Sequence, residues 1–189
     1  MSSHRLPILA VVIPVALGAL AACGNSLSLL TAHEPNVVDT VSLYAIDGTP
    51  VTTPSAYDIT VGSKINPAQR DQFDFAVNIT AAGKPVLLST GALGLGRSSG
   101  LVPEAPGSFD AITQAPGSGY NDSTAVAADS GAVVVIRSRP TLCVGTVTLY
   151  NFAKVEVLKV DTVARRIDLK MLDDLNCGYH GLAPGLPKN

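Results

Sequence analysis

The sequence predicts an all-β protein, folded as a single antiparallel β-sandwich-like domain with a long Gly/Pro-rich loop excursion. The chain has 17 Gly and 13 Pro among its 189 residues, which suits strands joined by turns better than long helices. Several short segments alternate apolar and polar residues, and this period of two is typical of half-buried strands. Turn signals such as Asp47-Gly48 separate these segments.

Residues 1–22 have the three parts of a secretory signal peptide. A cationic start at Arg5 precedes an apolar core from Leu6 to Leu20, and small residues follow. The apolar stretch is shorter than the roughly 20 residues that a spanning helix needs, and Gly24 stands where a charged stop would be expected. We therefore expect this segment to be removed.

Leu20-Ala21-Ala22-Cys23 resembles the lipobox of bacterial lipoproteins. The resemblance implies that the signal is cleaved before Cys23, that this cysteine is acylated with chains such as palmitate, and that the protein is anchored in the cell envelope. Since Gly24 is not Asp, the resemblance also implies the outer membrane if the organism has two membranes. Each buried methylene adds about 0.8 kcal/mol, so several acyl chains give a stable membrane anchor. The alternative is an ordinary signal peptide with a chance cysteine.

We divide the chain into a signal peptide at 1–22, a lipidated tether at 23–36 and a β-rich domain at 37–189. The tether is composed largely of Ser, Leu, Thr, His and Pro and has no steady period. A net charge of −2, without a basic and aromatic-rich patch, argues against nucleic acid as a partner. The expected partners are a lipid membrane, through acylated Cys23, and a protein or small-molecule ligand.

The first half of the domain predicts strands at 37–46, around 57–61, at 73–79 and at 86–88. Asp47-Gly48 predicts a two-residue hairpin turn between the first two strands, because both central positions of that turn need positive φ. Segment 73–79 has the cleanest alternation in the chain and predicts a core strand. Its apolar face is formed by Phe73, Phe75, Val77 and Ile79.

The segment from Gly91 to Gly131 predicts a long surface excursion with a short ordered piece near Phe109. Loops of this length in a compact domain are usually functional or disordered. If the domain has a binding site, we expect this excursion to contribute to it.

The C-terminal part of the chain is the most strongly patterned. Residues 132–136 are continuously apolar and predict a strand covered on both faces. Further strands are predicted at 144–152 and 155–160, and the return at 166–171 alternates apolar and charged residues. We expect the last two strands to form a hairpin.

Cys143 and Cys177 are the cysteines that remain once Cys23 is assigned to lipid. In an exported chain they are expected to form a disulfide, and closing a loop of about 34 residues would stabilise the fold by roughly 3–4 kcal/mol. The absence of a C-x-x-C spacing argues against a metal site, and no His/Asn pattern marks either cysteine as a nucleophile.

Gly96-Arg97-Ser98-Ser99-Gly100 matches the G-x-S-x-G nucleophile elbow, and His180 lies downstream. That motif requires a helix after the serine, whereas Pro103 and Pro106 follow here. We therefore expect no catalytic residue and no enzyme, and a serine hydrolase using Ser98 is the weakest of the hypotheses.

Three C-terminal segments, at 134–138, 152–158 and 166–169, resemble the last strands of HmuY-type haem-carrier lipoproteins, and Phe73-Asp74-Phe75-Ala76 is similar to another strand of that family. The resemblance implies a β-rich fold and a haem-carrier function. The ligating histidines of the family cannot be carried over, because no histidine lies between His33 and His180.

The leading functional hypothesis is a non-enzymatic binding or structural module of the envelope that uses the Gly91–Gly131 excursion and holds no cofactor. The alternative is a haem or metal carrier, for which the candidate ligand-binding residues are His180, Tyr179 and Tyr120.

Overall fold

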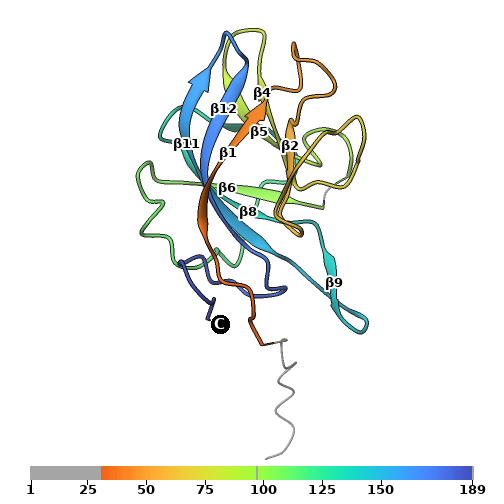
Figure 1. Cartoon of the computed structure of the whole chain (residues 1–189), viewed down its shortest axis with the longest axis vertical. Helices are drawn as coiled ribbons and strands as arrows, with labels where there is room; N and C mark the ends of the chain where they lie inside the picture. Colours follow the sequence, from red (N-terminus) through yellow and green to blue (C-terminus); the bar gives the residue numbers. More distant parts are fainter. Residues whose placement is uncertain (1–30, 97, 189) are drawn as a thin grey trace, which may run out of the picture.

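The computed structural model describes residues 31–96 and 98–188. The predicted signal peptide, Cys23 and most of the tether lie outside these residues. Within them the fold is all-β, as predicted, and it contains no helix that could span a membrane. Two five-stranded antiparallel sheets face each other, and a two-stranded hairpin stands apart from both (Figure 1).

The strands of the first sheet, in spatial order, are β1 (Val38–Tyr44), β12 (Arg166–Asp174), β11 (Phe152–Asp161), β8 (Val133–Arg137) and β6 (Gly100–Glu104). The second sheet consists of β3 (Ser63–Ile65), β2 (Ala56–Asp58), β4 (Phe75–Ile79), β5 (Pro85–Ser89) and β7 (Val126–Ala127). The separate hairpin pairs β9 (Thr141–Val144) with β10 (Val147–Leu149).

The main hydrophobic core lies between the two sheets, and a second apolar cluster lies outside the first sheet. Strand β8 contributes to both, since Val134 and Ile136 join the main core while Val133 and Val135 join the outer cluster. All four side chains are at most 1% exposed. This alternation confirms the prediction that residues 132–136 form a strand covered on both faces.

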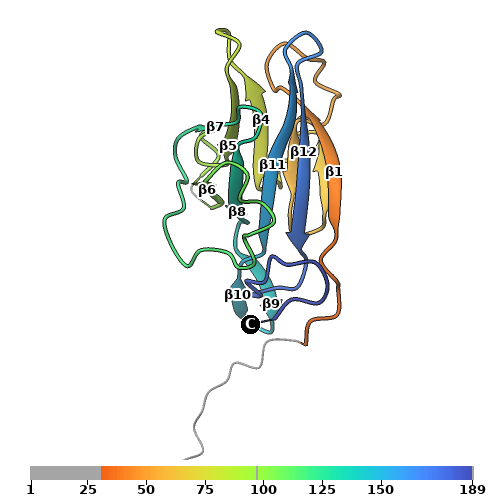
Figure 2. The same cartoon turned by 90° about the vertical axis from the view of Figure 1, so that its left-hand side faces the viewer.

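The predicted excursion is what covers the outer face of β8. Its ends form β6 and β7, and the segment between them (105–125) packs on the first sheet (Figure 2, green). Phe109 is 1% exposed there. The ammonium group of Lys154 in β11 donates to the carbonyl oxygens of Phe109 (2.7 Å) and Ile112 (2.8 Å). The excursion is therefore part of the packed domain.

The hairpin predicted around Asp47-Gly48 is wrong. Gly48 does have positive φ, at 73°, but β1 pairs with β12 and β2 lies in the other sheet. The turn carries the chain from one sheet to the other. A local turn signal shows that the chain changes direction, but it does not determine which strand pairs with the one before the turn. Here β1 forms seven residue pairs with β12.

The predicted core strand at 73–79 begins later than expected. Phe75, Val77 and Ile79 lie in the main core, as predicted. Phe73 precedes β4 and packs in a smaller cluster with Ile65 and others on the opposite side of the second sheet. The alternation of apolar and polar residues starts at Phe73, two residues before the strand itself begins.

The C-terminal hairpin of β11 and β12 is confirmed, with Ile167, Leu169 and Met171 buried in the main core. The predicted strands 144–152 and 155–160 divide at a different point, because β10 ends at Leu149 and β11 begins at Phe152.

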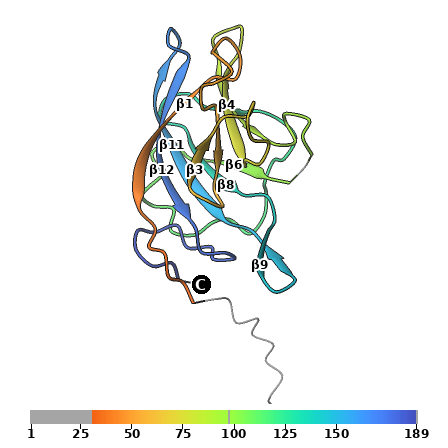
Figure 3. The same ribbon diagram turned by 45° about the vertical axis from the view of Figure 1, so that its right-hand side comes forward.

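Cys143 and Cys177 are paired as predicted, with their Cα atoms 5.8 Å apart, within the range that a disulfide needs. The bond links the β9–β10 hairpin to the segment that follows β12. Figure 3 shows this hairpin projecting from the end of the domain at which the C-terminus also lies.

The described residues of the tether are bound to the domain. The backbone N–H groups of His33 and Glu34 donate to the side-chain oxygen of Asn176, at 2.9 and 3.0 Å. Asn36 is 3% exposed and donates to the carbonyl of Gly181 at 2.7 Å. The domain's contacts therefore extend in the N-terminal direction to these residues.

Candidate functional site

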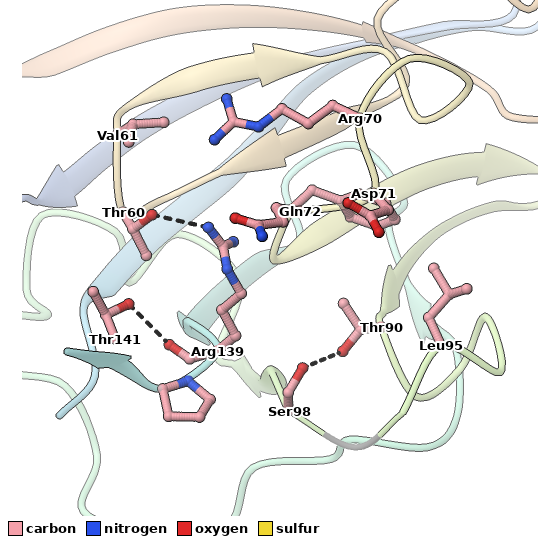
Figure 4. Close-up of a pocket in the computed structure, with 12 residues that line it drawn as sticks. Thr60, Val61, Arg70, Asp71, Gln72, Thr90, Leu95, Ser98, Arg139 and Thr141 are labelled. Atoms are coloured by element: carbon pink, nitrogen blue, oxygen red, sulfur yellow. Dashed lines mark hydrogen bonds between the residues drawn. The ribbon is translucent and has the colours of Figure 1, made fainter. Parts of the chain in front are cut away.

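A cleft of about 510 Å³ lies among the described residues around Arg139, and we call it the arginine cleft (Figure 4). It is lined mainly by polar side chains, which come from the β2–β4 region, the end of β5, the Gly91–Gly131 excursion and the chain after β8. These polar residues include Thr60, Arg70, Asp71, Gln72, Thr90, Ser98 and Arg139.

Arg139 forms the fixed base of this cleft. Its guanidinium donates to both carboxylate oxygens of Asp58, at 2.9 and 3.0 Å, and to Asp74 at 3.1 Å. Its backbone N–H also donates to Asp74, at 2.7 Å. Both aspartates are 0% exposed. Asp58 ends β2, Asp74 precedes β4 and Arg139 follows β8, so this cluster joins the second sheet to the first.

The charges of the cluster shift one another's pKa. Burial raises the pKa of Asp74 to about 6, although the hydrogen bonds and charge of Arg139 and the hydrogen bond from Ile59 act to lower it. For Arg139, burial acts to lower the pKa, but the hydrogen bonds and charges of Asp58 and Asp74 outweigh burial and raise it. The guanidinium is therefore permanently charged and held in one orientation, and little of its hydrogen-bonding capacity is left for a ligand.

The side chains at the rim of the cleft are more exposed than Arg139 and its aspartates. Arg70 has 46% of its side chain exposed and donates to Asp58 at 3.1 Å. Asp71 and Gln72 are also exposed. Across the cleft, the hydroxyl groups of Thr90 and Ser98 lie 3.0 Å apart. The rim thus presents guanidinium, amide, carboxylate and hydroxyl groups around a fixed cationic base.

Ser98 lies in the cleft, but its surroundings are not those of a nucleophile. Its hydroxyl contacts Thr90, and none of the described residues that line the cleft is a histidine. Gly100, the last residue of the G-x-S-x-G match, begins strand β6 where a hydrolase would have a helix. The serine therefore lacks the neighbouring base that would activate it.

Two of the three candidate ligand-binding residues, Tyr120 and His180, line a second, smaller cavity of about 130 Å³, which we call the aromatic pocket. Its other main walls are Arg137, Tyr150 and Phe152. The rings of His180 and Phe152 are 4.4 Å apart.

Tyr179 does not line the aromatic pocket. Its phenol oxygen instead accepts a hydrogen bond from the backbone N–H of Ala32, at 3.2 Å. The structure therefore brings together two of the three residues and directs the third toward the N-terminal segment.

Arg137, which ends β8, has an unusual place in this pocket. Its guanidinium carbon lies 4.9 Å from the centre of the Tyr120 ring and 4.6 Å from that of Tyr150, both within the range of a cation–π contact. Its Nε is buried and has no hydrogen-bond partner among the described residues. A buried donor without a partner costs about 1–3 kcal/mol.

The sequence patterns did not predict Arg139 and the two aspartates that hold it, or Arg137 of the aromatic pocket. Asp58, Asp74, Arg137 and Arg139 lie at or next to the ends of buried strands, where a charged residue looks like an ordinary strand boundary. The available signal was Asp74, since a carboxylate between two buried phenylalanines requires a partner.

Comparison of the chain with protein-family models, with curated proteins and with solved structures finds no match. No group of three or more potential metal ligands occurs among the described residues. The geometry of the arginine cleft and of the aromatic pocket is therefore the basis for proposing a function.

Proposed function

We propose that this protein is a lipoprotein of the cell envelope, anchored through acylated Cys23, whose β-domain is a non-enzymatic module that binds a small, hydroxyl-rich ligand such as a saccharide. The observation that carries this proposal is the arginine cleft, where a buried ion cluster fixes Arg139 beneath a polar rim.

The lining of the arginine cleft favours a neutral ligand over an ion. Arg139 is neutralised by Asp58 and Asp74, and Arg70 shares the Asp58 carboxylate. The rim groups provide both donors and acceptors, as ring hydroxyls require. A cleft of about 510 Å³ lies within the roughly 300–1,000 Å³ of ordinary ligand sites.

Apolar contacts are also available at the cleft. Val61 and Leu95 line it and are 50% and 59% exposed. The C–H face of a sugar ring could cover them and remove this apolar surface from water. A binding role is supported over catalysis because the hydroxyl of Ser98 contacts that of Thr90, and the described lining of the cleft contains no imidazole.

The anchor and the ligand are tested separately. Labelling of growing cells with an alkynyl palmitate analogue is expected to mark the wild-type protein and not Cys23→Ser. Absence of label on the wild type would contradict the lipoprotein assignment.

For the ligand, full-length protein in detergent micelles is applied to an array of mono- and oligosaccharides. Binding is expected to weaken in Arg70→Ala and Gln72→Ala and to be unchanged in Lys64→Ala, which removes an exposed side chain outside the cleft's lining. The ligand assignment fails if no saccharide binds or if the three variants bind alike.

The haem alternative has less support. The aromatic pocket that contains His180 measures about 130 Å³, below the roughly 300 Å³ at which ordinary ligand sites begin. We expect that haem added to the purified protein gives the same Soret band with wild type and with His180→Ala. A His180-dependent Soret shift would reverse this order and support the HmuY-type resemblance.

A further inference from the structure

We propose that the aromatic pocket is a binding site for a carboxylate group, with Arg137 as the residue that pairs with it. This inference does not rest on the arginine cleft, because it concerns another cavity and another ligand.

Arg137 differs from every other arginine that the structure describes. Arg70 and Arg139 pair with aspartates, and so does Arg166 with Asp168. Arg165 donates to two backbone carbonyls. Among the described residues, no carboxylate pairs with the guanidinium of Arg137, its Nε has no hydrogen-bond partner, and the rings of Tyr120 and Tyr150 lie beside it.

The Nε–H group of the Arg137 guanidinium remains open to a ligand. The guanidinium carbon lies over the rings of Tyr120 and Tyr150, which are apolar neighbours on their faces, and a guanidinium donates its hydrogen bonds in its own plane. A carboxylate accepts two parallel N–H bonds from such an edge, which makes it the natural partner for a stacked arginine.

The phenols of the pocket are not equivalent. Tyr120 donates its hydroxyl to the carbonyl of Pro116 at 2.9 Å, which fixes the ring. The hydroxyl of Tyr150 has no hydrogen-bond partner in residues 31–96 and 98–188, so it is available to donate to a ligand oxygen. Arg137 and Tyr150 are therefore the two polar contacts that we assign.

Size and charge restrict the ligand further. The pocket's volume of about 130 Å³ admits a carboxylate with a few carbon atoms but not a large acid. Among the described residues that line the pocket, Arg137 is the one permanently charged side chain, and the others are aromatic or aliphatic residues, glycines and His180. A monovalent anion balances this charge, whereas a phosphate dianion would remain partly unpaired in an apolar site.

Two contacts of the surrounding chain hold these walls in place. Gly100 pairs with Arg137 across β6 and β8, and a Cβ atom at position 100 would lie 2.7 Å from that of Tyr120. Glycine there lets Tyr120 approach Arg137. On the other side, the N–H of Gly178 donates to the carbonyl of Tyr150 at 3.0 Å, next to the Cys143–Cys177 disulfide.

A carboxylate could come from a free small acid or from the C-terminus of a peptide. Full-length protein in non-ionic micelles is titrated by calorimetry and by NMR with acetate, with trialanine, with trialanine amide and with inorganic phosphate. We expect saturable binding of acetate or trialanine near the millimolar range and none of trialanine amide. Tighter binding of trialanine than of acetate assigns the peptide source, and the reverse assigns the free acid.

The variants decide whether Arg137 carries the binding. Arg137→Gln is expected to lose at least about tenfold in affinity, because the charged hydrogen bonds are lost. Tyr150→Phe, which keeps the ring, should lose several-fold, and Lys159→Gln, which removes an exposed cation elsewhere, should bind as the wild type does.

Gly100→Ala is a second route to the same site, since it displaces Tyr120 and leaves Arg137 unchanged; it should weaken binding even if Arg137→Gln does not fold. The proposal is overturned if neither carboxylate binds, if phosphate binds more tightly than both, or if binding survives unchanged in the folded variants.

Discussion

Replacing Arg139 by Met should destabilise the domain more than any other single change to the arginine cleft. The substitution removes four side-chain hydrogen bonds to carboxylates and to Thr60, and it leaves Asp58 and Asp74 buried without their main cation. Breaking a buried ion pair by removing one partner costs about 3–5 kcal/mol.

The structure places the expected loss at the lower end of that range, near about 3 kcal/mol. Asp58 keeps Arg70, and Asp74 keeps the backbone N–H groups of Ile59 and of residue 139. For a domain of this size the melting temperature should fall by roughly 6–12 °C. Arg70→Met is the matched control, since this arginine is 46% exposed and its loss should cost less than about 1 kcal/mol.

Urea denaturation of the wild type and both variants, followed by circular dichroism at pH 7 and pH 5, measures these differences. Without Arg139, the burial that already raises the pKa of Asp74 to about 6 loses its main opposing charge, so the pKa should rise further. Acidification then neutralises Asp74, and the penalty of Arg139→Met should shrink at pH 5. Equal losses in the two variants, or a penalty that grows at pH 5, would refute the reasoning.

Three further predictions concern stability. Lys154→Met leaves two backbone carbonyls of segment 105–125 without their donor, so it should lower the free energy of unfolding by about 1–3 kcal/mol and speed hydrogen exchange in that segment. Lys159→Met is the control and should change neither quantity. Reducing the Cys143–Cys177 disulfide should lower the free energy of unfolding by roughly 3–4 kcal/mol, and a loss below about 1 kcal/mol would count against the pairing. Burial raises the pKa of Asp174 from 3.8 to about 6, so between these values the folded state holds a proton that the unfolded chain releases. The free energy of unfolding should therefore fall as pH rises from 4 to 6, and Asp174→Asn should reduce this dependence on pH.

The strands that could be predicted are those whose own pattern carries the information. Residues 132–136 and the return at 166–171 place the correct side chains in the core, because alternation is a property of a single strand. Strand pairing is not local. The turn at Asp47-Gly48 therefore indicated a hairpin, while β1 instead pairs with β12, far along the chain.

The candidate sites divide in the same way. Tyr120 and His180 could be selected as ligand-type residues, but nothing in the sequence places them together or turns Tyr179 away. The glycine match at 96–100 pointed to Ser98, whereas the glycine with a clear structural reason is Gly100, which admits Tyr120 beside Arg137.

The all-β class and the faces of segments 132–136 and 166–171 follow from the spacing of residue types along one segment, so the sequence alone predicts them. The pairing of Cys143 with Cys177 could be predicted because they are the two cysteines of the expected domain. Only the tertiary structure decided that Asp58, Asp74 and Arg139 form one buried cluster and that Arg137 stands without a carboxylate. The reason is physical: a buried charge depends on partners that approach from other strands, and the packing of the two sheets selects those partners.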